Sequence, residues 1–565
     1  MSSVPRCDHK NPTPHPPLAD TIADVTTPAD EPDHDAAGPA PERDPSSEAA
    51  IQVARDHRTR LFLIAGAIGL TSGALAVLFA WSLFAAEEAR RASFARLRDV
   101  PFGWAVMPAV GLVVGCFIGV IVQRFSPEAK GSGIPHVKGV LLRLRTMDWR
   151  TLVPVKFGAG VLGLGVGLSL GREGPTVQLG AAAGQAIGTL LRAPPRVLPQ
   201  LISCGSGAGL SAAFNAPLAG FVFVIEELRR EMSAITYGAA LIAAVCANVV
   251  ARALTGEMPS FHVPPTPAAP LIALPAVIAI GILGGLGGVL FNQSLLATQR
   301  AGRAAARVIP AWTLPGIAAM AAGIVGWWLP DAIGGGHATA DHLLSGGAAG
   351  TAWTAILVLL VAKLAMTLVS YGSGAPGGIF APMLVLGAVL GLLSGRATES
   401  LAPGLGVHET TFAVLGMAAW FTGSVRAPLT GIVLILEMTG NQDHLFSLCV
   451  VCLTAYLTAE RLRDTPIYEA LLAEDLRLRG GPQTDEHAAP TNVVMSVQTG
   501  SVLDGKTLRE IPWPPGSLVV GIERHGEDIV PTGASRLRAG DHITVLVPSD
   551  APDAALKIVD LCRVP

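Results

Sequence analysis

The feature that most constrains this fold is an internal repeat of apolar segments that are interrupted by glycine and proline. The stretch 171–175 (Gly-Arg-Glu-Gly-Pro) matches 378–382 (Gly-Ile-Phe-Ala-Pro) at an offset of 207, and Leu-Gly-Ala follows both at the same spacing. A second match joins 216–220 (Ala-Pro-Leu-Ala-Gly) to 427–431 (Ala-Pro-Leu-Thr-Gly) at an offset of 211. Two matches in the same order indicate a duplicated scaffold. Interrupted helices at corresponding places in two halves are typical of transporters whose site lies at the repeat interface.

The composition places this repeat in a membrane. Of the 565 residues, 50% are hydrophobic and 15% are charged, whereas a typical soluble domain has about 25% charged residues. Apolar runs at 104–122, 235–250, 271–290 and 353–369 span or nearly span a bilayer. We therefore expect an integral membrane protein. The net charge of −3 gives no reason to expect a nucleic acid or another polyanion as a partner.

The sequence predicts four parts. Residues 1–54 lack an apolar core and are rich in proline and aspartate, which indicates a disordered tail and no cleavable signal peptide. The membrane domain is expected at 55–475, with repeat halves at about 58–254 and 271–460, before a linker at 476–489 and a soluble domain at 490–565. Arginines lie on both sides of the first apolar segment, so the distribution of positive charge does not settle its orientation.

The motif at 171–175 places charge inside an apolar run. Because burying a carboxylate at membrane depth costs about 2.5–3.5 kcal/mol, we expect Glu173 to have a function. The flanking glycines allow the backbone to leave the helix and turn its N–H groups toward a ligand. We therefore predict an anion site that contains a titratable residue. The alternative is a carboxylate held in an ion pair with Arg172. In the second copy Phe380 replaces Glu173, so the predicted chemistry is asymmetric.

Other patterns carry less functional information. The break at 131–135 (Gly-Ser-Gly-Ile-Pro) fits either an interhelical turn or part of a site. The seven cysteines are scattered, and the pair Cys449 and Cys452 is interpreted as small core residues rather than half of a metal site. The apolar region shows neither a nucleophile–base–acid set nor a metal cluster, so we expect neither enzymatic activity nor a bound metal.

The motifs at 131–135, 171–175 and 377–382, with an isolated Tyr468 after the last apolar segment, resemble the CLC chloride channel and transporter family. The resemblance covers roughly 58–475, with the motifs in the family's order. It implies an all-α polytopic membrane protein of two inverted repeats with tilted, broken helices. It also implies a homodimer in which each subunit has a pore, with chloride and protons as transported ions and no cofactor. Helix N-termini meeting at the site suit an anion without binding it as tightly as a full cation would.

The resemblance implies roles for individual residues. The hydroxyls of Ser132 and Tyr468 and the amides of Ile379 and Phe380 would bind a central chloride. The amides around Arg172, Glu173 and Gly174 would form an outer site. Glu173 would be the gate, because its ionised carboxylate competes with chloride and moves aside once protonated.

The same resemblance makes Glu227 the residue that distinguishes exchange from conduction. A glutamate at this position marks proton-coupled antiporters, in which it transfers protons internally toward the gate. The alternative is a passive chloride channel on the same fold. Lys156 matches a family position near the pore and would bias the local potential, unless it is a paired or snorkelling lysine. The repeat pairs Glu226 with Glu437, and both are expected to be structural, with Arg229, Arg230 or Arg426 as partners.

Residues 490–565 are predicted to form a small α/β domain. Strands are predicted at 518–522 and 542–547, and helices at 501–511 and 551–561. The runs at 505–508, 519–522 and 537–541 resemble the TrkA-C domain of potassium-conductance regulators. This resemblance implies a cytoplasmic sensing or dimer-stabilising domain with an unknown small ligand. We accordingly expect a multi-pass protein of the cell inner membrane with cytoplasmic termini.

Overall fold

A computed structural model describes residues 45–195, 197–229, 234–257, 259–261, 263–264, 266–347, 350–478, 491–524, 527–547 and 552–562. The chain divides into the units Met1–Asp56 and His57–Pro565. Residues 1–44, and with them most of the expected N-terminal tail, lie outside the described residues. The first helix, α1, begins at Pro45, inside the segment expected as a tail. Most of the expected linker at 476–489 also lies outside the described residues.

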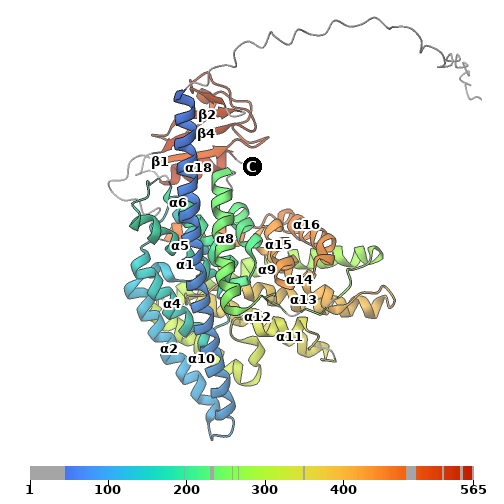
Figure 1. Ribbon diagram of the computed structural model, residues 1–565. Helices are drawn as coiled ribbons and strands as arrows, with labels where there is room; N and C mark the ends of the chain where they lie inside the picture. The colour runs from blue at the N-terminus through green and yellow to red at the C-terminus, as the bar shows by residue number, and fades with distance from the viewer. Residues whose placement is uncertain are drawn as a thin grey trace, which may run out of the picture. The chain divides into compact units, whose positions relative to one another are not determined.

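The membrane domain is helical and many of its helices are short (Figure 1). The first half contains α1 (Pro45–Leu97), α2 (Gly103–Phe125), α3 (Ile134–Leu141), α4 (Trp149–Gly165), α5 (Glu173–Leu190), α6 (Leu198–Phe214), α7 (Pro217–Phe223), the π-helical turn η2 (Val224–Arg229) and α8 (Ala234–Thr255). The second half contains α9 (Leu274–Ala305), α10 (Leu314–Trp328), α11 (His337–Leu344), α12 (Trp353–Gly372), α13 (Phe380–Leu401), α14 (Glu409–Val425), α15 (Pro428–Thr439) and α16 (Leu445–Arg461). The last helix of this domain is α17 (Ile467–Leu478).

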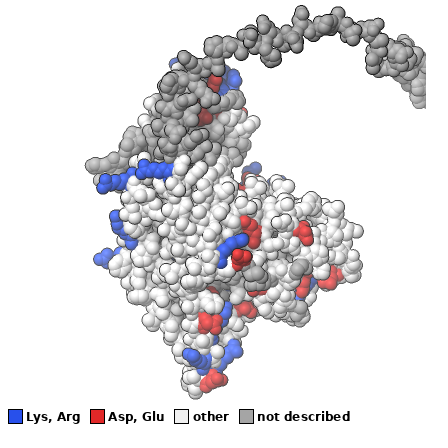
Figure 2. Space-filling model, viewed as in Figure 1, with Lys and Arg blue, Asp and Glu red and all other residues white. Residues whose placement is uncertain are grey.

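Seven helices in the described part of the chain are long and apolar enough to cross a membrane. Other helices are too short, such as α3 and α11 with eight residues each and α7 with seven. At a rise of about 1.5 Å per residue they cover less than half of a bilayer core of about 30 Å. Charged side chains are sparse over the face of the membrane domain that Figure 2 shows. The chain is therefore a multi-pass membrane protein with broken helices, as expected.

The duplication extends to backbone conformation. Asn215 and Arg426, which are 211 positions apart, follow α6 and α14 with left-handed φ values of 56° and 66°. Equivalent glycines also make equivalent helix contacts. A Cβ at Gly180 would lie 2.1 Å from the carbonyl oxygen of Gly205, and a Cβ at Gly387 would lie 2.4 Å from that of Gly416. Glycine thus lets α5 pack closely on α6, and α13 on α14, as is common in membrane helix pairs.

The two halves meet through a local two-fold relation. Gly171 and Gly378 form an antiparallel bridge in which each N–H donates to the other's carbonyl, at 2.6 and 2.7 Å. Equivalent residues that exchange both hydrogen bonds in this way are related by a two-fold rotation. The equivalent helices α2 and α10 also pack against each other (Figure 1). These contacts agree with the inverted repeat that the resemblance implies.

Glu226 and Glu437 make a second exchange between the halves. The Glu226 carboxylate accepts from the backbone N–H groups of Leu429 and Thr430 at the start of α15 (3.1 and 2.7 Å). The Glu437 carboxylate accepts from the corresponding groups of Leu218 and Ala219 at the start of α7 (3.1 and 2.8 Å). Each glutamate therefore caps the first turn of a helix in the other half.

These contacts fit the expected structural role of both glutamates. The prediction that Arg426 pairs with one of them was wrong. Its guanidinium bonds the Gly423 carbonyl and lies 3.8 Å from an Asp464 carboxylate oxygen. The side chains of Arg229 and Arg230 lie outside the described residues. Helix amides can satisfy a partly buried carboxylate without an ion pair, because the N-terminal end of a helix carries partial positive charge.

The C-terminal domain is a four-stranded antiparallel sheet in the order β1-β4-β2-β3 with one helix. Its elements are β1 (Thr491–Ser496), β2 (Leu518–Arg524), β3 (Glu527–Ile529), β4 (His542–Val547) and α18 (Pro552–Cys562). Strands β2 and β4 and helix α18 confirm the predicted elements. The predicted helix at 501–511 was wrong. Gly505 has a φ of 78° there, and only the 3-10 turn η7 (Leu508–Glu510) forms.

An ion pair between a buried carboxylate and a partly buried arginine lies in this domain. Asp541 accepts from the Nε and Nη2 of Arg524 (2.8 and 2.7 Å) and from the backbone N–H of Arg538 (2.8 Å). Burial opposes ionisation of Asp541, but these donors outweigh it and hold the pKa of Asp541 below its ordinary value of 3.8. Because the folded-state pKa is the lower one, the stabilisation is complete above about pH 4 and is lost as the pH falls through the folded pKa.

We expect Asp541→Asn to destabilise the C-terminal domain by about 2 kcal/mol at neutral pH and to weaken its acid sensitivity. Hydrogen exchange of the β4 amides in the full-length protein, corrected for intrinsic exchange between pH 7 and pH 3, measures both effects. Asp528→Asn, on the exposed strand β3, is the control and should leave protection unchanged. Wild-type protection in Asp541→Asn at pH 7 would show that the pair does not stabilise the domain.

Candidate functional site

Three helices begin at glycine-rich breaks that are joined by backbone hydrogen bonds. Gly133 (φ 88°) precedes α3, and α5 and α13 begin at Glu173 and Phe380. The Gly171–Gly378 bridge joins the last two breaks. Gly131 joins the first to the third, because its N–H donates to Ala375 (3.2 Å) and its carbonyl accepts from Gly377 (3.0 Å). Helix N-termini carry free N–H groups and partial positive charge, so their convergence creates an anion-attracting region.

Glu173 reaches from the first half to the second. Its side chain is fully buried, and its Oε2 accepts from the backbone N–H of Ala381, in the first turn of α13, at 3.4 Å. The carboxylate therefore lies at the helix end where an anion would bind. Arg172 does not hold it there, because its Nη2 donates to the carbonyl of Ala213 (3.2 Å). The geometry thus favours the predicted anion site over the ion-pair alternative.

Two buried hydroxyls in this region have no hydrogen-bond partner among the described residues. They are Ser132 Oγ, just before α3, and Tyr468 Oη, in the first turn of α17. Their residues are 1% and 0% exposed. A buried polar group without a partner costs about 1–3 kcal/mol and calls for an explanation. Hydroxyl donors of this kind fit an anion.

The backbone approaches this site without room for larger side chains. A Cβ at Gly174 would lie 2.5 Å from Ser132 Oγ and 2.7 Å from the Ser132 carbonyl oxygen. Ile379 precedes α13, and the buried ring of Phe380 packs at 5.2 Å from Phe214, which fixes the start of that helix. The structure therefore brings the residues that were predicted from the sequence to bind chloride to three adjoining breaks and α17.

A cavity of about 360 Å³ reaches Ser132. Gly131, Ser132, Tyr371 and the first turn of α3 contribute to its walls, and Lys130 and Arg303 also line it. Tyr371, on α12, was not predicted from the sequence to be near the site. It is buried, and its hydroxyl lies against the backbone of this loop, 3.1 Å from where a Cβ on Gly131 would lie. The cavity therefore brings polar and charged side chains close to the residue that carries the buried Ser132 hydroxyl.

Lys156 supports the loop that carries Ser132. Its Nζ is fully buried and donates to the carbonyls of Ala129 (3.0 Å) and Gly131 (2.7 Å). These bonds are incompatible with the snorkelling alternative. Lys363, 207 positions later on α12, repeats the arrangement by donating to Gly334 (2.9 Å). Lys363 was not predicted from the sequence, although its offset from Lys156 equals that of the first repeat match.

Glu227 lies in the π-helical turn η2 and is 1% exposed. Its Oε1 accepts from the Nζ of Lys138, on α3, at 2.8 Å. Lys138 also lies 3.5 Å from Glu469 Oε1, next to Tyr468 on α17. The hydroxyl of Tyr468 lies within electrostatic range of both Glu227 and Glu173. Sequence reasoning missed Lys138, because a lone lysine in a short apolar helix gives no signal of a partner 89 positions away.

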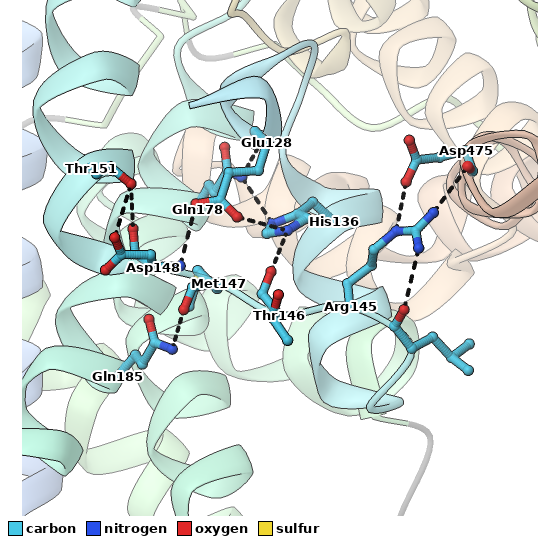
Figure 3. Close-up of polar contacts among 11 residues, drawn as sticks. Glu128, His136, Arg145, Thr146, Met147, Asp148, Thr151, Gln178, Gln185 and Asp475 are labelled. Carbon is cyan, nitrogen blue, oxygen red and sulfur yellow. Dashed lines mark hydrogen bonds and ion pairs between the residues drawn. The ribbon is translucent and has the colours of Figure 1, made fainter. Parts of the chain in front are cut away.

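A polar network holds α3 against α5 and α17 (Figure 3). Gln178, on α5, donates from its side-chain amide to the Glu128 carbonyl (3.0 Å) and contacts His136 Nδ1 (3.2 Å). Arg145, after α3, bonds both the carboxylate (2.9 Å) and the backbone carbonyl (3.0 Å) of Asp475 on α17. The segment around α3, which follows Ser132, is therefore fixed to α17, which carries Tyr468, by contacts outside the predicted anion site.

Duplicated broken helices around a buried, anion-attracting centre define a membrane transport protein. Comparison with known families agrees. Residues 114–460 match the family described as voltage gated chloride channel, and residues 493–560 match the TrkA-C domain. The chain belongs to this chloride channel and transporter family, the CLC family, and carries a C-terminal TrkA-C domain.

Named relatives cover most of the chain. The H(+)/Cl(−) exchange transporter ClcA of Yersinia pseudotuberculosis serotype IB is 38% identical over 464 residues, which cover 79% of this chain and 95% of that protein. The ClcA of Klebsiella pneumoniae strain 342 is 37% identical and covers 74% of this chain and 89% of that protein. The chain thus resembles these relatives through nearly their whole length.

Solved structures show the same fold. The crystal structure of a slow cyanobacterial Cl⁻/H⁺ antiporter superposes with a TM-score of 0.70 at 30% identity, covering 74% of this chain and 99% of that one. A eukaryotic CLC transporter superposes with a TM-score of 0.62 at 22% identity, covering 80% of each chain. The predicted fold class, including the family and the small C-terminal sheet domain, is therefore confirmed.

Proposed function

We propose that this protein exchanges chloride for protons across a membrane. The observation that carries the proposal is the Glu173 carboxylate at the N-terminal end of α13, where it accepts from Ala381. A carboxylate that uses the same amides as an anion makes anion binding depend on its protonation. The names of the relatives, which are H(+)/Cl(−) exchange transporters, support the same reaction.

In this proposal chloride and the Glu173 carboxylate compete for the helix-end amides. The central chloride binds the hydroxyls of Ser132 and Tyr468, with the amides of Ile379 and Phe380. The amides around Arg172 and Gly174 hold the outer position when Glu173 leaves it. When a proton reaches Glu173, the neutral carboxyl loses its attraction to the amides and moves aside, which admits chloride. Glu173 is thus both the gate and the proton acceptor.

Glu227 supplies the second proton-transfer position. It is a buried carboxylate within electrostatic range of Tyr468, whose hydroxyl belongs to the proposed central site. A proton that moves from Glu227 to Glu173 therefore passes close to the proposed chloride site. We propose that Lys156 keeps the Ser132 loop in place through its bonds to Ala129 and Gly131.

We further propose the setting in which this exchange occurs. The protein acts as a homodimer in the cell inner membrane, with cytoplasmic termini and one pore in each subunit. The TrkA-C domain binds a small ligand or stabilises the dimer.

The reversal potential of reconstituted vesicles tests exchange against passive conduction. With a fixed chloride gradient, an imposed pH gradient should shift the potential at which net flux is zero, because protons carry part of the charge that moves in each exchange cycle. Chloride and proton fluxes are recorded together with ion-selective electrodes. A reversal potential that follows chloride alone at every pH would show a passive channel and refute the exchange proposal.

A further inference from the structure

Lys138 lies between two carboxylates from different elements. Its Nζ is 2.8 Å from Glu227 Oε1 in η2 and 3.5 Å from Glu469 Oε1 in α17. The Lys138 and Glu227 side chains are 7% and 1% exposed, whereas the Glu469 side chain is 21% exposed. The cation is therefore buried with one fully buried carboxylate and one partly exposed carboxylate.

This arrangement meets a specific difficulty of proton transfer through Glu227. If Glu227 takes up a proton, a lysine paired with it alone becomes an uncompensated buried charge, which is strongly unfavourable. A second carboxylate within reach removes that penalty, because the ammonium can shift its main contact without leaving the cluster. Glu469 is placed for this, since its oxygen is already at 3.5 Å.

We propose that Lys138 is a positioning residue that acts as a shared counterion, paired mainly with Glu227 when Glu227 is ionised and mainly with Glu469 when Glu227 is protonated. This inference rests on the proposed function of Glu227. In the step concerned, a proton delivered by water adds to a carboxylate oxygen of Glu227, which becomes neutral. Lys138 keeps its three protons and its charge, so no other group is titrated.

The same shift connects the proton step to the chloride site. Lys138 belongs to α3, which begins two residues after Ser132, and Glu469 follows Tyr468 in the first turn of α17. A stronger pull of Lys138 on Glu469 acts directly on the turn that carries the Tyr468 hydroxyl. Protonation of Glu227 thereby changes the forces on α3, which follows Ser132, and on α17, which carries Tyr468.

Among the described residues, the elements near η2 bring the following charged and titratable groups toward Glu227. Helix α3 brings Lys138, and α17 brings Glu469 and the hydroxyl of Tyr468. Helix α6 contains one titratable side chain, the thiol of Cys204, and α7 contains none. The turn η2 itself contains Glu226, which caps α15, and Arg229. Lys138 is therefore a cation in direct contact with Glu227.

Chloride-driven proton uptake by vesicles, measured as a function of pH, tests this inference. Lys138→Met should raise the pH of half-maximal uptake by about 1 unit or more, since an opposite charge at this range shifts a titration by about 1–3 units. Lys138→Arg should restore the wild-type profile. Glu469→Gln should move the profile toward lower pH, because Lys138 then has Glu227 as its sole carboxylate partner in the cluster. In the Lys138→Met background, Glu469→Gln should have a much smaller effect.

An unchanged pH profile in folded Lys138→Met, or equal Glu469→Gln shifts in both backgrounds, would overturn the inference. Chloride calorimetry and a monodisperse elution profile establish that each variant is folded. Should Lys138→Met fail to fold, Glu469→Gln decides the question alone, because a wild-type profile there contradicts the shared-counterion role. Glu227→Gln separates the two proposals. If it retains proton movement, the proposed role of Glu227 fails. If it loses proton movement while Lys138→Met behaves as wild type, only the inference fails.

Discussion

Glu173→Ala will abolish proton movement while chloride still crosses the membrane. The variant lacks the carboxylate that accepts from Ala381 at the start of α13, so no titratable group competes with chloride for the helix-end amides. The amides themselves remain, because they are backbone groups held by the Gly171–Gly378 bridge. We expect chloride flux within about tenfold of wild type, and proton flux that falls to the level of protein-free vesicles. Simultaneous recording of both ions measures the effect.

A matched control is available in Glu437→Gln. Glu437 is also a carboxylate that accepts from helix-end amides, those of Leu218 and Ala219, but it lies at the other exchange between the halves. The amide side chain keeps one acceptor there, so we expect normal coupling of protons to chloride. Proton uptake that persists in Glu173→Ala would remove Glu173 from the proton path. Loss of coupling in Glu437→Gln would show that capping, rather than gating, explains both results.

Local patterns in the sequence were sufficient to predict the duplicated helical scaffold. Glycine and proline breaks are visible in a few residues, so the matching breaks at 171–175 and 378–382 could be identified as equivalent. The structure joins them through Gly171 and Gly378. The pairing of Glu226 with Glu437 was visible through the offset of 211, although its chemistry was not. Carboxylates that bind helix amides leave no charged partner for sequence reasoning to find.

The parts of the candidate site that were missed depend on contacts between distant segments. Lys138 contacts Glu227 through the packing of α3 on η2, which no local pattern reports. Tyr371 belongs to α12 but its hydroxyl lies against Gly131, in the Ser132 loop of the other half. In the C-terminal domain, the sequence of 501–511 suggested a helix, but Gly505 takes a left-handed conformation and the chain turns. The roles of Glu173 and Glu227 stay predictions, because geometry places the carboxylates without showing proton transfer.

Gly174→Ala is expected to weaken chloride binding by at least about tenfold, which corresponds to about 1.4 kcal/mol. The added Cβ would lie 2.7 Å from the Ser132 carbonyl oxygen and 3.0 Å from the Gly378 Cα. The Ser132 hydroxyl, at 2.5 Å, can rotate away, but these two backbone atoms cannot yield without moving two of the three breaks. The displacement separates the Ser132 hydroxyl from the α13 amides, so the anion loses part of its set of donors. Calorimetric titration of the purified protein with chloride measures the change.

Gly158→Ala provides the control for the chemistry of the substitution. Gly158 lies within α4, and a Cβ there would meet no atom within 4 Å. The same substitution should therefore leave chloride affinity unchanged and increase helix stability by up to about 1 kcal/mol. Wild-type affinity in Gly174→Ala would mean that the backbone at this point is free to move, and the anion would then have to bind elsewhere. A loss confined to Gly174→Ala would indicate that close backbone approach, which glycine permits, is what brings the two halves of the repeat onto one ion.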